Sequence, residues 1–292
     1  MAKKAHHKEK AKRRRDARAA GMSQGGVRVD AARTAGAAEG RATACAGAAV
    51  SAAVPAHAPA AHPADAPRPA TGGRGVFITF EGGDGVGKST HIRRLATALK
   101  DEGREVLVLR EPGGTSVGEM LRSVVLDPAN DGLSDEAELL IYEAARAQIV
   151  VEVIEPALAR GAVVLCDRFA DSTVAYQAYG RGLDRAFVDA ANAFATRGVM
   201  PDRTILLVCR SAADGLVRAT ARGADRLEGA GAAFHDRVAA GFAAIAEADP
   251  ERVRVVDSSG AYRATGAAVR AAVADLFGWA ADGSGEGGVR HA

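Results

Sequence analysis

The chain has 292 residues, of which 48% are hydrophobic and 25% are charged, a composition ordinary for a globular protein of one or two domains. Its formal net charge of +2 hides an uneven distribution, because residues 1–20 carry +7 (nine Lys or Arg against Glu9 and Asp16) and the other residues carry −5. A mildly acidic body argues against a nucleic-acid-binding surface there. No apolar run reaches the roughly 18 residues needed to span a membrane, so we expect a soluble protein.

Residues 1–73 are predicted to form a disordered tail. They begin rich in Lys, Arg and His and continue as Ala, Gly and Pro with few large apolar side chains, so they cannot bury enough surface to offset the entropy of ordering. No apolar central region of a signal peptide is present, whereas an organellar transit peptide fits the composition in part. The basic block could bind nucleic acid, but a solvated extension is the simpler expectation. Translation could start at Met1, at Met22 or nearer Gly75.

The three cysteines, Cys45, Cys166 and Cys209, show neither a C-x-x-C motif nor the spacing of a metal site. Cys166 and Cys209 end apolar strand-like runs, where a buried thiol is the usual state. We therefore expect neither a disulfide nor a metal role for them, and a reducing, cytoplasmic location.

From residue 74 onward, strand-like and helical segments alternate, which predicts an α/β fold with a parallel sheet and helices on both faces. The expected strands are residues 76–80, 105–109, 162–166, 203–209 and 253–257. The expected helices are residues 87–101, 116–126, 134–160, 172–179, 184–197 and 261–277, with two more between the last two strands. This domain is predicted to span residues 74–280, followed by a flexible Gly-rich tail at 281–292.

The most informative motif lies between the first strand and the first helix. Residues 82–89 read GGDGVGKS and fit G-x-x-x-x-G-K-[ST], the phosphate-binding P-loop. Glycines allow backbone N–H groups to face phosphate oxygens, and the following helix adds the positive end of its dipole. Lys88 is expected to bridge the outer phosphates, and the Ser89 hydroxyl to ligate Mg²⁺. The strand before and the helix after argue against a chance match.

Polar residues also follow the second and third strands, at the edge where ligands bind in open α/β sheets. Residues 110–114 read REPGG, and Asp167 and Arg168 follow the third strand. Asp167 can reach the Mg²⁺ shell, and Arg168 can hold a phosphate with two parallel hydrogen bonds. Each charged pair alone could equally be a surface salt bridge. Two basic clusters facing one P-loop indicate a second anionic substrate.

Five segments together resemble bacterial thymidylate kinase: FEGGDGVGKST, REPGG, Tyr-x-x-x-Arg at 142–146, DRFADSTVAYQ at 167–177 and the Arg-rich stretch 218–226. The resemblance runs from about residue 75 to residue 277. It implies a P-loop nucleoside monophosphate kinase fold, a five-stranded parallel sheet flanked by helices with an Arg-rich lid. It also implies phosphorylation of dTMP to dTDP with ATP and Mg²⁺, and a homodimer.

The resemblance assigns residues to three sites. The ATP phosphates would be held by Gly82, Gly83, Asp84, Gly85, Val86, Gly87, Lys88, Ser89 and Thr90. The dTMP site would comprise Asp84, Glu111, Pro112, Arg122, Tyr142, Arg146, Arg168, Ser172, Thr173, Tyr176 and Gln177. The metal would be held by Ser89 and Asp167.

Within the dTMP site, the resemblance implies distinct roles. Arg122 and Arg168 would hold the phosphate, and Asp84 would meet the 3′-hydroxyl. The ring of Tyr142 would stack on thymine while Arg146 donates to its O4, since a pyrimidine with carbonyl edges suits a flat aromatic ring and a donor. Without the resemblance, Tyr142 and Arg146 would be an ordinary helix face. The ring of Tyr176 would leave no room for a ribose 2′-hydroxyl.

The catalytic residues implied are Lys88, Arg168, Arg218 and Arg222. The variable P-loop positions 83–86 hold no cation, although charge builds on the transferring phosphoryl group, so the lid stretch 218–226 is expected to supply one. The other interpretation of this stretch is a solvated basic helix end.

The chain departs from the usual family pattern at Phe169, Ala178, Val208 and Thr220, and its lid looks slightly short. Two alternative functions remain open at this point. One is a kinase for another small acceptor, such as a different nucleotide. The other is a catalytically silent P-loop module that the basic tail delivers to nucleic acid, against which the intact Lys88, Ser89, Asp167 and Arg168 argue.

Overall fold

The computed structural model describes residues 73–209 and 225–279. Three predicted features lie outside these residues: the N-terminal tail up to residue 72, the lid residues Arg218, Thr220 and Arg222, and the C-terminal tail at 281–292. Of the predicted tail at 1–73, only residue 73 is described.

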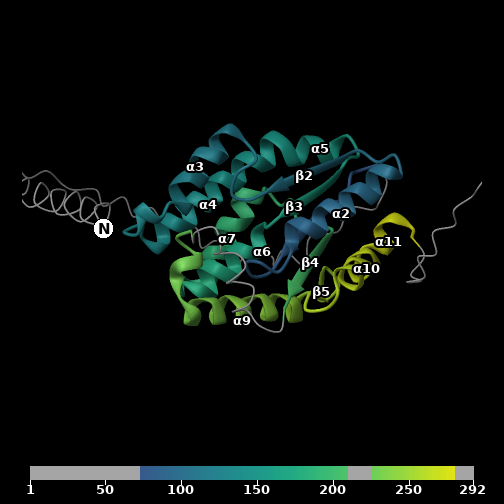
Figure 1. The fold of residues 1–292 in the computed structure, drawn as a ribbon. Coiled ribbons are helices and arrows are strands. Elements are labelled where there is room, and N and C mark those ends of the chain that lie inside the picture. The colour runs from purple at the N-terminus through teal and green to yellow at the C-terminus, as the bar shows by residue number, and fades with distance from the viewer. Residues whose placement is uncertain (1–72, 210–224, 280–292) are drawn as a thin grey trace, which may run out of the picture. The chain divides into compact units, whose positions relative to one another are not determined.

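Five parallel strands form one sheet in the order β2-β3-β1-β4-β5, which confirms the predicted architecture (Figure 1). The strands are β1 (Phe77–Glu81), β2 (Val106–Arg110), β3 (Val163–Asp167), β4 (Arg203–Val208) and β5 (Val253–Asp257). The first three begin and end one residue later than predicted. The reason is that their final polar residues still pair in the ladder, as Glu81 does with Leu206 and Arg110 with Asp167.

Thirteen helical segments lie within the described residues. They are α2 (Lys88–Asp101), α3 (Ser116–Leu126), η2 (Pro128–Asn130), α4 (Asp135–Ile149), η3 (Val150–Ile154), α5 (Glu155–Ala159), α6 (Ala170–Thr173), η4 (Val174–Gly180), α7 (Arg185–Thr196), η5 (Glu228–Ala230), α9 (Ala232–Ala248), α10 (Tyr262–Ala272) and α11 (Ala274–Phe277). Side-chain caps begin several of them: the Thr115 hydroxyl accepts from Gly118 N–H, and the Ser134 hydroxyl accepts from Ala137 N–H.

The long helix predicted over 134–160 is interrupted by a wide π-helical stretch at η3 between α4 and α5. Pro156 lies two residues after the end of this stretch. Proline has no N–H to donate, and its ring clashes with the carbonyl four residues back, so the helix widens there rather than continuing regularly. The helix predicted over 172–179 begins as the short regular helix α6 and continues from residue 174 as a second wide stretch, η4.

Alternate residues of the strands point to opposite faces of the sheet, and different helices cover each face (Figure 1). Ile78 and Phe80 of β1 pack with α2, α10 and α11, whereas Phe77 packs with η3 and α5. Near β4 and β5, the second face is covered by α9 and η4. Cys166 is fully buried in β3, as predicted. Within the described ranges, no helix combines the length and the hydropathy that a membrane span requires.

Candidate active site

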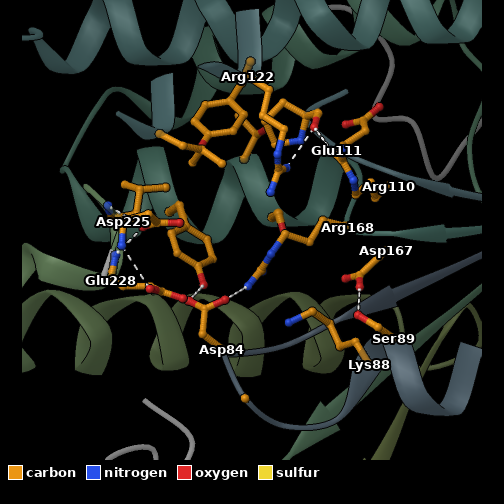
Figure 2. A pocket seen from close by; sticks show the side chains of 18 of the residues that line it. Asp84, Lys88, Ser89, Arg110, Glu111, Arg122, Asp167, Arg168, Asp225 and Glu228 are labelled. Atoms are coloured by element: carbon orange, nitrogen blue, oxygen red, sulfur yellow. Dashed lines mark hydrogen bonds and ion pairs between the residues drawn. The ribbon is translucent and has the colours of Figure 1, made fainter. Parts of the chain in front are cut away.

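A cavity of about 430 Å³ opens at the carboxyl ends of β1, β2 and β3 (Figure 2). Most of the predicted site residues line it: Asp84, Gly85, Gly87, Lys88, Ser89, Thr90, Glu111, Pro112, Arg122, Tyr142, Arg146, Asp167, Arg168, Ser172, Thr173, Tyr176 and Gln177. Gly82, Gly83 and Val86 instead line a neighbouring cavity of about 310 Å³ beside α9. The fold therefore brings segments nearly 100 residues apart in sequence to one site.

The loop between β1 and α2 turns tightly, as its glycines require. Gly82 has a φ of 122°, and a Cβ atom there would lie 2.2 Å from the carbonyl oxygen of Leu207, so no side chain fits. Lys88 is buried and donates to the carbonyl oxygens of Gly82 and Gly83 at 3.1 and 2.8 Å. Burial, with the nearby charge of Arg168, lowers the pKa of Lys88 to about 8. An anion bound beside this ammonium would stabilise its charge.

Ser89 and Asp167, the two predicted metal ligands, lie in direct contact. The Ser89 hydroxyl, in the first turn of α2, donates to Asp167 Oδ2 at 2.7 Å, at the end of β3 (Figure 2). A hydroxyl and a carboxylate side by side next to a phosphate-binding loop are the oxygen donors that Mg²⁺ takes from proteins.

Arg168 lies at the centre of the cavity. Its φ of 71° is unusual for a residue with a side chain, and such strain is common where a functional group must be aimed. Its guanidinium donates to Asp84 Oδ1 at 2.5 Å, to the Gly82 carbonyl at 3.0 Å and to the Ser172 hydroxyl at 3.1 Å. Burial opposes ionisation of Asp84, but Arg168 and Lys88 outweigh it and hold the pKa of that carboxyl below its usual value.

The turn that carries Arg168 is held by Glu81, the last residue of β1. This buried carboxyl group accepts from the Phe169 N–H at 2.7 Å and from the Ser172 hydroxyl at 2.5 Å. Burial, together with the neighbouring charge of Asp171, raises the pKa of Glu81 to about 8. The hydroxyl of Ser172 is thus engaged between Glu81 and Arg168.

Arg122 and Arg168, the predicted phosphate-binding pair, both line this cavity, and in Figure 2 Arg122 reaches in from above while the Arg168 side chain extends toward Asp84. Arg122 donates to the carbonyl oxygen of Pro112 at 2.9 Å. Burial, with the nearby charge of Arg110, lowers the pKa of Arg122. Two guanidinium groups that face one cavity make a site for a doubly charged anion.

Arg146, the predicted donor to the base, is almost completely buried on α4. Its Nε and Nη2 atoms lie 2.9 and 2.8 Å from Glu111 Oε2. Its Nη1 donates to three oxygens at 2.7–2.8 Å, on Glu143, Thr173 and Asn192. Burial raises the pKa of Glu111 to about 7, although Arg146 opposes the shift. Because these contacts engage Nε, Nη1 and one side of Nη2, the Arg146 guanidinium is held rigidly. One N–H of Nη2 is not directed at Glu111.

The comparisons with known proteins agree with this geometry. The sequence model described as thymidylate kinase matches residues 80–269. The chain belongs to the thymidylate kinase family. The thymidylate kinase of Geobacter sulfurreducens is 48% identical over 202 residues, covering 67% of this chain and 94% of that protein. That of Solidesulfovibrio magneticus is 48% identical over 210 residues, covering 69% of this chain and 100% of that protein.

A solved structure supports the fold as well. The crystal structure of thymidylate kinase from Ehrlichia chaffeensis aligns with a TM-score of 0.54 at 34% identity, and covers 65% of this chain and 90% of that one. Membership of the thymidylate kinase family identifies the chain as an enzyme, a phosphotransferase that converts dTMP to dTDP at the expense of ATP. The silent binding module is therefore set aside.

Three of the departures from the thymidylate kinase pattern fall on described residues, and two of them, Phe169 and Ala178, are buried packing residues. Phe169 is fully buried, packs edge-on against Phe77 at 4.9 Å between ring centroids, and lies 5.3 Å beneath the Arg146 guanidinium. Ala178 is buried in the cluster beneath α9, and Val208 lines the smaller cavity. None of the three contacts the phosphate-binding loop residues Lys88 or Ser89 through a hydrogen bond.

Four cavity residues were not predicted from the sequence: Leu126, Asp225, Leu227 and Glu228 also line the larger cavity. Arg110, from the REPGG segment already noted in the sequence, lines it too. The acids Asp225, within the Arg-rich stretch, and Glu228, just after it, were a visible signal, because carboxylates beside a basic lid segment indicate a polar surface. Arg226, the one lid arginine described, donates from Nε to the Val125 carbonyl at 3.0 Å and from Nη2 to Glu138. It is thus bound to α3 and α4 rather than to the phosphate loop.

Proposed function

We propose that ATP and dTMP meet in the 430 Å³ cavity, with the ATP phosphates on the P-loop and the dTMP phosphate between Arg122 and Arg168. The observation that carries this assignment is that three cationic side chains line a single cavity. Lys88 and Arg168 lie together and donate to the same Gly82 carbonyl oxygen, and Arg122 lines the cavity as well. Phosphoryl transfer needs the attacking and leaving oxygens nearly in line, and two phosphates bound in one cavity can take up that arrangement.

Ser89 and Asp167 fit a magnesium site. Their oxygens are in contact, and Mg²⁺ is usually held by one or two protein oxygens together with substrate phosphates and waters rather than by a protein cage. In agreement, no group of three or more His, Cys, Asp or Glu side chains suited to a metal occurs among the described residues. When bound, the ion would neutralise charge on the phosphates that Lys88 also contacts.

The thymine ring is assigned to the side of the cavity formed by Tyr142 and Arg146, with Ser172, Thr173 and Gln177 around it. Tyr142 and Arg146 are four residues apart on α4, so both side chains point to the same side of the helix. The network that holds Arg146 already fixes its guanidinium in the free protein, so base binding costs less side-chain entropy.

The sugar is assigned to Asp84 and Tyr176. The Tyr176 hydroxyl donates to Asp84 Oδ2 at 3.3 Å, and its ring lies 5.0 Å from the Arg168 guanidinium carbon. A deoxyribose held between the base and phosphate sites would place its 3′-hydroxyl near the Asp84 carboxylate and the 2′-carbon against the Tyr176 ring.

Catalysis is then a matter of positioning and charge neutralisation. Lys88 and Arg168 contact the phosphates across which transfer occurs, and their charges stabilise the negative oxygens of the transferring group. Arg218 and Arg222 are proposed to add a further cation there, since no P-loop residue other than Lys88 supplies one.

A coupled assay for ADP release tests the substrate assignment. Purified protein receives ATP, Mg²⁺ and one of dTMP, dUMP, UMP, dCMP or GMP, and we expect dTMP to give the highest kcat/KM. A rate with dTMP no higher than the acceptor-free ATPase background would contradict the proposal.

The metal assignment needs its own test. Ser89→Ala and Asp167→Asn should each raise the Mg²⁺ concentration needed for half-maximal rate by roughly tenfold or more, since each removes one oxygen ligand. The dissociation constant for dTMP, measured by calorimetry without ATP or metal, should stay near that of the wild type. An unchanged Mg²⁺ dependence in both variants would remove these residues from the metal site.

We further propose that the kinase forms a homodimer in the cytoplasm through an apolar stripe on α3. Val117, Met120 and Val124 are 42–60% exposed at helical spacing, and Leu140 of the adjoining α4 is 56% exposed. Light scattering after gel filtration should give the mass of two chains, and Met120→Lys with Val124→Lys should give the mass of one. The basic tail, where any nucleic-acid binding was expected, lies outside the described residues.

A further inference from the structure

Glu138 is a fully buried carboxylate on α4 that contacts a substrate-site residue without lining the cavity itself. Its Oε1 accepts from Gln177 Nε2 at 2.8 Å and from Arg181 Nε at 3.1 Å. Its Oε2 accepts from Arg181 Nη2 at 2.8 Å and also from Arg226. Burial opposes ionisation, but the hydrogen bonds from Arg181 and Gln177 outweigh it and hold the pKa of Glu138 below its usual value. The group is therefore an ionised carboxylate.

An ionised carboxylate decides which way the amide of Gln177 points. The oxygen and nitrogen of a glutamine amide have nearly the same shape, and only their hydrogen-bond partners distinguish them. Since a carboxylate accepts and never donates, the end of Gln177 that faces Glu138 must be the NH₂ group. The Gln177 carbonyl oxygen is consequently turned away from Glu138. In the part of the chain that the structure describes, no donor is bonded to that oxygen, and Gln177 lines the cavity.

Arg146 supplies hydrogen-bond donors beside the acceptor of Gln177. Thr173 and Gln177 are one helical turn apart, and the Thr173 hydroxyl accepts from Arg146 Nη1 at 2.8 Å. This contact places the Arg146 guanidinium and the Gln177 amide on the same side of the α6–η4 segment. Arginine offers donors only, whereas Gln177 in this orientation offers an acceptor.

A donor beside an acceptor matches one kind of pyrimidine edge. Thymine and uracil present an accepting O4 next to a donating N3–H. Cytosine presents a donating amino group next to an accepting N3, the reverse at both positions. A site with buried polar groups rejects a ligand that leaves them unpaired much more strongly than an apolar site does.

We infer that Glu138 is a positioning residue for base specificity: it orients the Gln177 amide so that the site takes pyrimidines with an N3–H and rejects cytosine. The inference rests on the proposed placement of the base beside Arg146 and Gln177. Glu138 itself does not touch the substrate.

The decisive variant is Glu138→Gln. The new amide can accept from Arg181 and Arg226 and can also donate, so it no longer fixes which end of the Gln177 amide faces it. The readout is the ratio of kcat/KM for dUMP to that for dCMP, because these substrates differ only at positions 3 and 4 of the ring. We expect the ratio to fall by roughly tenfold or more, whereas a merely structural role would lower both values together and leave the ratio unchanged.

Asp135→Asn is the matched control. Asp135 also pairs with Arg181, at 3.3 Å, but has no contact with Gln177. The substitution removes one negative charge beside the same arginine. We expect the dUMP/dCMP ratio of kcat/KM to stay within about threefold of the wild-type ratio, a smaller change than the loss of a specificity contact causes. A folded Glu138→Gln protein with an equally unchanged ratio would overturn the inference.

Two further variants complete the test. Gln177→Leu removes the acceptor, so a ratio unchanged in this variant means that the base lies elsewhere and the proposed site is wrong. A ratio that falls in Gln177→Leu but not in Glu138→Gln refutes only the role of Glu138. If Glu138→Gln does not fold, Glu138→Asp keeps a negative charge beside Arg181 and Arg226 but withdraws the carboxylate from the Gln177 amide. A dUMP/dCMP ratio that falls in this variant supports the inference, and an unchanged ratio contradicts it.

Discussion

Asp84 in the phosphate-binding loop is bonded to Arg168 at the end of β3, with 2.5 Å between Oδ1 and Nη2. The two residues are 84 positions apart and belong to the two halves of the proposed reaction, the ATP loop and the dTMP phosphate site. In the proposed arrangement, the boundary between donor and acceptor falls at this single ion pair, which is partly exposed. Substitutions at this boundary should therefore separate effects on the sugar from effects on phosphoryl transfer.

If Asp84 meets the 3′-hydroxyl of dTMP, its loss and the loss of that hydroxyl should not be additive. For the wild type, replacing dTMP with its 3′-deoxy analogue should lower kcat/KM by roughly tenfold or more, because a hydrogen bond to a charged group is lost. For Asp84→Ala, the same replacement should matter little. Steady-state kinetics with both substrates on both proteins complete the cycle. An equal penalty in both proteins would place the hydroxyl elsewhere.

Tyr176 should control discrimination against ribonucleotides through its ring rather than its hydroxyl. Tyr176→Ala opens space beside Arg168, so activity on UMP relative to dUMP should rise. Tyr176→Phe is the matched control, since it keeps the ring and removes only the 3.3 Å contact with Asp84, and its ratio should stay near wild type. If neither substitution changes the ratio, Tyr176 is a packing residue.

Lys88 should take up a proton when ATP binds near pH 8. Its pKa in the free protein is lowered to about 8, mainly by burial, so about half of the molecules carry a neutral amine at that pH. Phosphate stabilises the ammonium and raises this pKa, so protons are taken up at pH 8 but not near pH 6, and affinity falls as pH rises above 8.

Calorimetry with a non-hydrolysable ATP analogue, in two buffers of different ionisation enthalpy, measures this uptake. Lys88→Arg is the control, since arginine stays charged throughout and should remove the uptake. Lys88→Ala should abolish turnover without unfolding the protein. The same uptake in Lys88→Arg as in the wild type would assign the proton to another group.

The lid arginines should differ in what they do. Arg218→Ala or Arg222→Ala should lower kcat by roughly 10²–10³-fold, as the loss of one preorganised donor does, with little change in dTMP affinity. Arg226→Ala should instead lower thermal stability, because Arg226 is bound to Glu138 and to the Val125 carbonyl. Values of kcat within about threefold of wild type for both Arg218 and Arg222 variants would make those residues solvated charges only.

Glu81 should make stability depend on pH. Burial and Asp171 raise its pKa from 4.5 to about 8 in the folded protein, so the folded state favours the protonated form. The corresponding stabilisation is complete below pH 4.5 and is lost as pH rises through 8. The glutamine in Glu81→Gln cannot ionise. The free energy of unfolding of this variant, relative to that of the wild type, should therefore increase between pH 5 and pH 8.5, by up to about 1.4 kcal/mol per pH unit.

Urea unfolding at three pH values, with the exposed Glu247→Gln as control, measures this difference. The free energy of unfolding of the control should change with pH as that of the wild type does. If the free energy of unfolding of Glu81→Gln showed the same pH dependence, Glu81 would not titrate in this range.

The sequence by itself determined the features that are local in the chain. The P-loop lies within residues 82–89, and its glycines and Lys88 need only the strand before and the helix after to take up their geometry. The same holds for the alternation of strands and helices, because apolar periodicity and turn residues act over a few positions. For this reason all five strands and the parallel sheet could be predicted, with errors of one residue at the ends of four strands.

Only the tertiary structure decided which polar side chains pair. Arg146 is joined to Glu111, Thr173 and Asn192, which lie 27–46 residues away, and Glu138 to Gln177, 39 residues away. No local pattern marks such partners, since they depend on which helix packs beside which. Once packing has buried these groups, each must find a partner or lose the free energy of its hydration. That requirement holds Arg146 in place and sets the orientation of the Gln177 amide.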